Sequence, residues 1–236
     1  MIIKVALIGN PNVGKTAIFN ALTGSRQHVG NWPGVTVEKK EGRCTHRGAE
    51  MEVVDLPGIY SLTASSIDER IARNYIIKER PDVVVDIVDA SNIERNLYLT
   101  LLLLELEANL IVALNMMDIA ASKGYEFDTE KLSLLLGVPV IPTVATTHFG
   151  IRELKDAIIE AASGKNKRRK VTIGYGEDLE TEIRRIEEMI MEDPHLSGTY
   201  PPRWLAIKIL ERDEEVIGIL ERYQKKDVLE VVGWEK

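Results

Sequence analysis

A glycine-rich stretch near the N-terminus carries the residue types that hold a phosphate group. Residues 9–16 read GNPNVGKT and fit the phosphate-loop pattern G-x-x-x-x-G-K-[ST]. Its glycines would let backbone N–H groups curl around a phosphate, and a following helix would point its positive end at the anion. Lys15 would reach the β- and γ-phosphates, and the Thr16 hydroxyl would bind Mg²⁺. The residues expected to contact a nucleotide here are Gly9, Asn10, Pro11, Asn12, Val13, Gly14, Lys15, Thr16 and Ala17.

A D-x-x-G motif at residues 55–58 would sense the terminal phosphate. Asp55 would hold Mg²⁺ through a water molecule, and the Gly58 N–H would meet the γ-phosphate. Thr36 lies in a loop just before a predicted strand and is the expected switch threonine. Its hydroxyl would complete the Mg²⁺ shell while GTP is bound and would let go after hydrolysis. Lys15, Thr36 and Gly58 are therefore candidate catalytic residues.

The residue after Gly58 is Ile59, where Ras-type GTPases carry a glutamine that orients the attacking water. An isoleucine side chain can neither donate nor accept a hydrogen bond. The water would have to be oriented by the backbone or by another group, so we expect slow intrinsic hydrolysis. No side chain of the sequence can be named as a general base.

An N-x-x-D motif at residues 115–118 favours guanine over adenine. The Asp118 carboxylate can accept hydrogen bonds from guanine N1–H and from the 2-amino group, a pair of donors that adenine lacks. Asn115 would brace the loops around the base, and Met116 would lie beside it. Each short motif is weak evidence alone, but all of them follow predicted strands, where α/β sheets bind ligands.

A second base-contacting loop is expected at residues 144–146, which read VAT where many GTPases have Ser-Ala. The Ala145 N–H could contact guanine O6 through the backbone. Val144 offers no hydroxyl, so we expect a looser loop, completed by Thr146. Asp118 should therefore matter more than this loop for base selection.

Composition narrows the class of protein. The chain has 236 residues, is 44% hydrophobic and 28% charged, and carries a formal net charge of −7. This balance is typical of a globular protein and does not favour a nucleic-acid partner. The single Cys44 cannot form an internal disulfide. The most apolar run, residues 97–106, contains Glu105 and falls short of the roughly 20 apolar residues of a membrane helix, so we expect no membrane span.

Strand-like and helical segments alternate up to residue 162. This predicts an α/β fold of the P-loop GTPase (Ras-like) type, with a mostly parallel sheet and flanking helices. A hairpin of residues 36–45 and 50–55 would add one antiparallel strand at an edge. The other expected strands are residues 2–8, 82–88, 109–114 and 139–142. The expected helices are residues 16–23, 68–78, 93–107, 129–136 and 151–162.

The pattern changes near residue 163. Residues 164–170 read GKNKRRK, a basic polar linker, and helices are expected beyond it at residues 179–191, 202–210 and 214–224. We therefore predict a nucleotide-binding G-domain over residues 1–164 and a small all-helical domain over residues 165–236.

The order of the motifs resembles one family. GNPNVGKT, GNWPGVTVE, DLPGIYSL and NMMD are similar to the translation-factor-related GTPases, and more narrowly to the N-terminal cytosolic G-domain of the ferrous iron transport protein B (FeoB) family. The segment RWLAIKILE extends the resemblance into the helical part. It implies a GTPase whose helical domain is linked to nucleotide release and tied to a membrane-spanning Fe(II) transport domain that this chain lacks. GTP would regulate or power iron uptake from the cytoplasmic side of the cell membrane; a homo-oligomer is left open.

The resemblance also implies a potassium site. In related potassium-activated GTPases, the asparagine at the position of Asn12 binds K⁺ beside the phosphates. The switch loop adds backbone carbonyls, which here would come from around Asn31 and Trp32. K⁺ would neutralise charge between the β- and γ-phosphates, part of what an arginine finger does. Asn12 thus joins the candidate catalytic residues of a slow, potassium-stimulated GTPase, although an asparagine there could also be a plain turn residue.

Two other functions stay open. An Era-like GTPase of ribosome assembly would usually carry an RNA-binding appendage with a basic face, whereas the chain from residue 177 onward is acidic. A nucleotide-gated interaction module would bind GTP without hydrolysing it in any salt. Trp32 could contact a partner, but a tryptophan in such a place more often anchors the loop.

Overall fold

The computed structural model describes residues 2–24, 27–164, 171–231 and 233, which fold into two compact units. The first unit comprises the described residues of Met1–Leu104 and Ala108–Val171, and the second those of Glu105–Glu107 and Thr172–Lys236. The linker expected at residues 164–170 lies, apart from Gly164, outside the described residues. The division predicted after residue 164 therefore stays a prediction.

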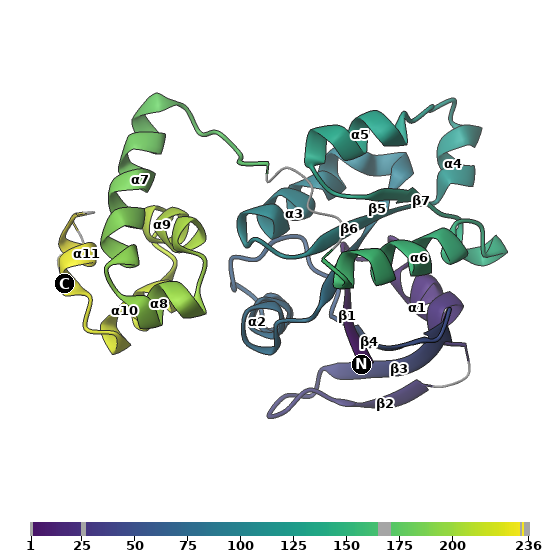
Figure 1. Cartoon of the computed structure of the whole chain (residues 1–236), viewed down its shortest axis with the longest axis horizontal. Coiled ribbons are helices and arrows are strands. Elements are labelled where there is room, and N and C mark those ends of the chain that lie inside the picture. The colour runs from purple at the N-terminus through teal and green to yellow at the C-terminus, as the bar shows by residue number, and fades with distance from the viewer. Residues whose placement is uncertain (1, 25–26, 165–170, 232, 234–236) are drawn as a thin grey trace. The chain divides into compact units, whose positions relative to one another are not determined.

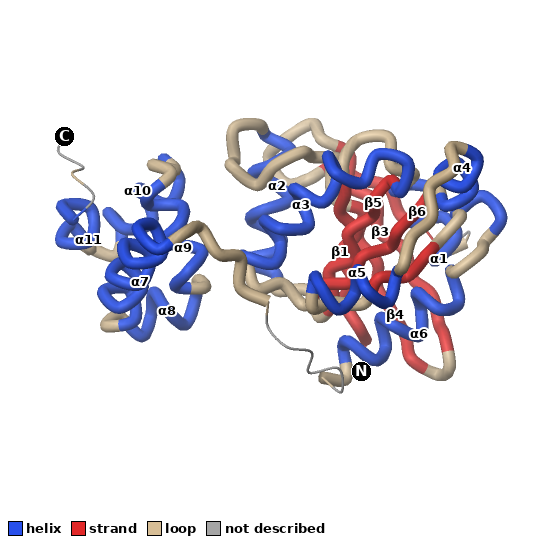
Figure 2. Tube along the Cα trace, turned by 90° about the horizontal axis from the view of Figure 1, so that it is seen from above, coloured by secondary structure: helices blue, strands red, loops and turns tan. Residues whose placement is uncertain are grey.

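The first unit is built on a seven-stranded sheet in the order β2-β3-β4-β1-β5-β6-β7 (Figures 1 and 2). Strand β1 pairs in parallel with β4 and β5, and β6 in parallel with β5 and β7. The strands are β1 Ile2–Gly9, β2 Gln27–Asn31, β3 Glu38–His46, β4 Ala49–Asp55, β5 Val83–Asp89, β6 Leu110–Asn115 and β7 Val140–Pro142.

The hairpin was expected to place its antiparallel strand at an edge, and this is wrong. Strand β3 does run antiparallel to β4, but β2 pairs with β3 on its outer side and becomes the edge strand. The sequence predicted a loop there, because β2 is polar and largely exposed and shows no alternation of apolar residues.

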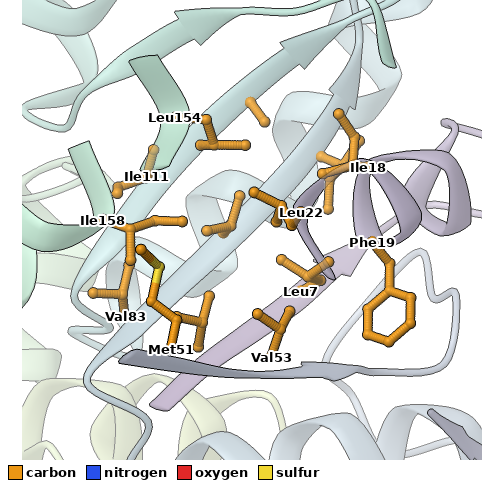
Figure 3. Close-up of a cluster of buried hydrophobic side chains, with 14 of the residues drawn as sticks. Leu7, Ile18, Phe19, Leu22, Met51, Val53, Val83, Ile111, Leu154 and Ile158 are labelled. Carbon is orange, nitrogen blue, oxygen red and sulfur yellow. The ribbon is translucent and has the colours of Figure 1, made fainter. Parts of the chain in front are cut away.

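Helices cover both faces of this sheet (Figure 2). Alternate β5 residues, Val83 and Val85 among them, pack in a core under helices α1 and α6, together with Leu7, Phe19 and Ile158 (Figure 3). The helices are α1 Lys15–Thr23, α2 Ile67–Asn74, α3 Ile93–Glu105, α4 Met117–Ser122, α5 Thr129–Leu136 and α6 Ile151–Ala162. Helix α4 was not predicted, and the helix expected over residues 68–78 ends as a π-helical turn, η1 Tyr75–Glu79.

The opposite face of β5 carries a buried carboxylate. Asp86 is 1% exposed, and the Thr100 hydroxyl of α3 donates a hydrogen bond to its Oδ2 at 2.6 Å. No hydrogen-bond partner for Asp86 Oδ1 lies among the described residues. Burial therefore raises the pKa of Asp86 to about 7, and the bond from Thr100 offsets only part of that rise.

This pKa gives the fold a predictable pH dependence. The unfolded chain holds its Asp86 proton only below about pH 4, whereas the folded chain holds it up to about pH 7. Protonated Asp86 contributes its full stabilisation of the folded chain below about pH 4. This contribution falls as pH rises and is lost once pH passes about 7. Relative to Asp86→Asn, the wild type should lose about 1 kcal/mol of unfolding free energy per pH unit between these values. Urea unfolding of both proteins at pH 5 and pH 8 measures it; an unchanged difference would contradict it.

The second unit is entirely helical where the structure describes it. Its helices are α7 Glu177–Met191, α8 Pro194–Thr199, α9 Pro202–Leu210, α10 Glu214–Arg222 and α11 Lys226–Val231. Trp204 and Leu205 of α9 are fully buried with Ile186 of α7. The Arg203 guanidinium donates hydrogen bonds to both carboxylate oxygens of Glu180, at 2.7 and 3.0 Å. None of the helices in the described part of the chain is long and apolar enough to cross a membrane.

Candidate nucleotide-binding site

The glycines of residues 9–16 are required by close packing. A Cβ on Gly9 would lie 2.5 Å from the Ile87 carbonyl oxygen on β5. Gly14 has φ 84°, and a Cβ there would collide with the Asn115 side chain. The loop leaves β1 at its carboxyl end and enters α1 at Lys15, the layout that aims backbone N–H groups and the helix N-terminus at an anion. Asn12 is exposed at φ 68°, a left-handed turn that asparagine tolerates.

Asn115 ties the phosphate loop to the second base loop. Its side chain is 2% exposed, and Nδ2 donates to the Val13 carbonyl at 2.9 Å. Its Oδ1 accepts from the Thr143 hydroxyl at 3.3 Å and from the Ala145 N–H at 3.2 Å. The Asn115 side chain therefore links residue 13 to residues 143 and 145, and its role in bracing a base-binding site stays a prediction.

The residues after Asn115 turn the chain toward solvent. Met116 adopts the left-handed conformation, φ 61°, and caps α4. Asp118 lies in the first turn of that helix with its side chain exposed. The Asp118 side chain is therefore accessible to solvent three residues after the buried Asn115.

The second base loop is more closed than the sequence suggests. Val144 and Ala145 are buried, and Thr146 is exposed. Because the Ala145 N–H already donates to Asn115, a contact of the same N–H with guanine O6 requires a shared or exchanged hydrogen bond. Val144 is held by its own N–H, which donates to the Phe149 carbonyl at 3.1 Å.

Lys15 and Asp55 form an ion pair at the centre of the site. Burial raises the pKa of Asp55, and the Coulombic attraction and hydrogen bond of Lys15 pull it back down. Thr16 is exposed beside this pair. An acidic oxygen and a hydroxyl are the ligand types that Mg²⁺ prefers.

The D-x-x-G loop packs directly against the phosphate loop. The Ile59 N–H donates to the Gly9 carbonyl at 3.2 Å, and a Cβ on Gly58 would lie 3.3 Å from Pro11 Cα. The Ile59 side chain is 2% exposed. It is turned into the core as well as apolar, so it takes no part in orienting water.

Of the expected switch residues, Asn31 ends strand β2, and Trp32 and Thr36 lie in the loop between β2 and β3. Asn31 and Thr36 are exposed, and Trp32 is buried. The Trp32 carbonyl accepts a hydrogen bond from the Val35 N–H at 3.3 Å. The hydrogen bonds of the described residues join the phosphate, D-x-x-G, N-x-x-D and VAT loops, but they do not link Asn31 or Thr36 to that cluster.

Parallel strands, a phosphate loop after β1 and an N-x-x-D loop after β6 define the class: a Ras-like P-loop G-domain, here followed by a small helical domain. The chain belongs to the ferrous iron transport protein B family. The family model described as ferrous iron transport protein B matches residues 3–158, and that of the FeoB cytosolic helical domain matches residues 175–233. The second match falls on the segment where an Era-like GTPase would need an RNA-binding appendage.

Named relatives and solved structures agree with this assignment. The chain is 54% identical over 217 residues to the Fe(2+) transporter FeoB of Methanocaldococcus jannaschii, covering 92% of this chain and 32% of that protein. The FeoB of Escherichia coli K12 is 46% identical, with 89% and 27% covered. The chain thus spans about a quarter to a third of the curated relatives it matches.

The cytosolic domain of the T. maritima FeoB iron transporter has been solved in several states. A GDP form aligns with a TM-score of 0.89 at 41% identity, covering 100% of this chain and 88% of that one. A GMPPNP form aligns with a TM-score of 0.87 at 41% identity, covering 99% and 87%.

Proposed function

We propose that this chain binds GTP with Mg²⁺ and hydrolyses it slowly. The observation that carries the proposal is the side chain of Asn115, which joins the phosphate loop to the base loop and leaves Asp118 exposed beside both. The GDP and GMPPNP forms of the T. maritima domain support a guanine nucleotide. Asp118 would then bind the base, and the residues around Lys15 would bind the phosphates.

Each phosphate-side residue has a role in this proposal. Lys15 would leave Asp55 for the β- and γ-phosphates, because a phosphate oxygen carries more charge than the carboxylate it replaces. Asp55 and the exposed Thr16 hydroxyl fit a hard cation, and Thr36 would join them once its loop moves. Bound Mg²⁺ would neutralise phosphate charge, and the Gly58 N–H would contact the γ-phosphate.

The potassium site is the finer part of the proposal. Asn12 supports it, since its left-handed turn leaves the side-chain amide exposed at the phosphate loop. Asn31 is exposed as well, whereas the Trp32 carbonyl would have to share its oxygen with the Val35 N–H. We therefore expect Asn12 and the Asn31 carbonyl to contribute more to K⁺ binding than the Trp32 carbonyl.

The potassium proposal predicts a salt effect that depends on Asn12. Wild-type GTP turnover should be about ten-fold faster in KCl than in NaCl at equal ionic strength, a barrier difference of about 1.4 kcal/mol. Asn12→Ala should turn over GTP at the NaCl rate in both salts while keeping its GDP affinity. Asn92→Ala removes another exposed asparagine, in the turn between β5 and α3, and should behave like the wild type. Equal wild-type rates in both salts would remove the potassium claim.

For the full-length protein we propose that this fragment lies on the cytoplasmic side of the cell membrane. There it would report its nucleotide state to a membrane-spanning Fe(II) transport domain, as the names of the relatives suggest. The helical domain would transmit that state or tune GDP release. Assembly of the fragment into a homo-oligomer is a further part of this proposal. Iron uptake by cells carrying full-length protein with Asp118→Asn tests the coupling; uptake equal to that of the wild type would contradict it.

A further inference from the structure

Trp32 is buried at the base of the loop that carries Thr36. Its side chain is 8% exposed, whereas Thr36 is exposed. The Trp32 N–H donates to the Val37 carbonyl at 2.9 Å, and its carbonyl accepts from the Val35 N–H. These bonds close the loop on both sides of Thr36. The backbone of Trp32 is therefore tied to both sequence neighbours of Thr36.

The Trp32 ring is held by residues from two other elements. The Tyr75 ring meets it edge-on, with centroids 5.5 Å apart and planes at 78°. Lys39 Nζ of β3 lies 5.0 Å from the Trp32 centroid. Tyr75 is the first residue of the π-helical turn that continues α2. Such turns are rare in proteins, and those that occur are often found at functional sites. Burial, and next the charge of Glu79, raises the pKa of Tyr75 to about 12, so Tyr75 acts here as a neutral ring.

Helix α2 is hydrogen-bonded to the segment that follows the D-x-x-G motif, from its first turn through Glu69 and from its last turn through Arg73. Arg73 is 2% exposed, and its Nη1 donates to the Leu62 carbonyl at 3.2 Å. The Glu69 carboxylate accepts from the Ser65 N–H at 3.0 Å and from the Thr63 hydroxyl at 3.1 Å. Helix α2 thus bonds the segment after the D-x-x-G motif, and the π-helical turn that continues it contacts Trp32 of the Thr36 loop.

We propose that Tyr75 is a positioning residue for the switch loop. Through the Trp32 ring it holds the Thr36 loop against the π-helical turn that continues α2, while Glu69 and Arg73 of α2 hold the segment that follows the D-x-x-G motif. This inference rests on the proposed function, because Thr36 can act only on bound GTP and Mg²⁺. Losing the ring contact would spread the loop over more conformations and lower the share in which Thr36 reaches the metal.

The test compares Tyr75→Leu with Tyr75→Phe in the full chain. Tyr75→Leu should lower kcat for GTP about three- to ten-fold, the range expected for one aromatic pair, and leave GDP affinity within about two-fold. Tyr75→Phe keeps the ring and should restore the wild-type rate. Tyr98→Leu removes an exposed tyrosine of α3 and is the matched control, expected to turn over GTP like the wild type.

A spectroscopic arm reports on the loop itself. Fluorine NMR of 5-fluorotryptophan protein gives resonances for the three tryptophans, and Trp32→Phe identifies that of Trp32. This resonance should move in Tyr75→Leu and not in Tyr98→Leu. If Tyr75→Leu fails to fold, Trp32→Leu breaks the same contact from the other side and should show the same loss of kcat.

The possible failures are distinguishable. A wild type that neither binds GDP nor hydrolyses GTP would reject the proposed function and this inference with it. A wild type that hydrolyses GTP, with Tyr75→Leu equal to it in kcat or with an unmoved Trp32 resonance, would reject the inference alone. A rate lost equally in Tyr75→Phe would show that the hydroxyl matters, not the ring, and would also overturn it.

Discussion

Asp118→Asn is expected to weaken GTP and GDP binding by about a hundred-fold or more and to turn the preference toward xanthosine nucleotides. A carboxylate accepts from both guanine N–H donors, whereas an asparagine amide sets its own NH₂ against one of them, and a buried donor left unpaired is costly. Xanthine carries a carbonyl in place of the 2-amino group of guanine, and this carbonyl oxygen accepts a hydrogen bond from the asparagine NH₂. Asp118 is exposed in the first turn of α4, and its replacement should leave the fold intact.

The measurement is a titration of each protein with fluorescent GDP, followed by competition with GTP and XTP. Asp178→Asn provides the matched control, because Asp178 is also an exposed aspartate in the first turn of a helix. It removes the same charge from the chain and should leave both affinities unchanged. Unchanged GTP affinity in Asp118→Asn would sink the assignment of the base site.

The phosphate loop and the N-x-x-D loop could be predicted from the sequence because local backbone geometry restricts the types of residue they can contain. Gly14 stands where φ is 84° and a side chain would meet Asn115, so the requirement is visible in the motif itself. Asn115 ends a strand of buried residues and Asp118 follows it, and the carboxyl ends of parallel strands meet at one edge. What these residues hydrogen-bond in the folded chain follows from that layout.

Elements that depend on tertiary partners could not be predicted. Strand β2 is stabilised by its pairing with β3, and its own residues are mostly polar and largely exposed. Helix α8 did have a local signal that was missed: Asp193 accepts from the N–H groups of His195 and Leu196, and Pro194 follows it at the first helical position. The contact of Trp32 with Tyr75 joins residues far apart in the sequence, where no pattern indicates it.

Removal of the Asn115 side chain is the second substitution expected to have a large effect. Asn115→Ala leaves the Val13 carbonyl and the Ala145 N–H without their buried partner, at about 1–3 kcal/mol for each such group. It also frees the phosphate loop from the base loop. We expect nucleotide affinity to fall by about a hundred-fold, since each 1.4 kcal/mol is about ten-fold. Calorimetric titration with GDP measures this.

Asn115→Asp separates the effect of the hydrogen bond to Val13 from that of the bonds to Thr143 and Ala145. An aspartate keeps oxygen acceptors for the Thr143 hydroxyl and the Ala145 N–H, but it sets a carboxylate oxygen against the Val13 carbonyl. Only the hydrogen bond to the Val13 carbonyl of the phosphate loop is lost. Affinity for GDP should therefore fall in this variant also, and it should fall less than in Asn115→Ala if the bonds to Thr143 and Ala145 contribute.

A buried asparagine elsewhere distinguishes bracing from general stability. Asn96 of α3 is 4% exposed. Its Nδ2 donates to the Asn92 carbonyl, and its Oδ1 accepts from the Asp89 N–H, both in the segment before α3. Asn96→Ala should also lower the melting temperature, because it removes a buried side chain and its two hydrogen bonds to the backbone. Only Asn115→Ala should lose GDP affinity. Equal losses of affinity in both variants would mean that binding merely follows stability, and the bridge between the two loops would then carry no specific role.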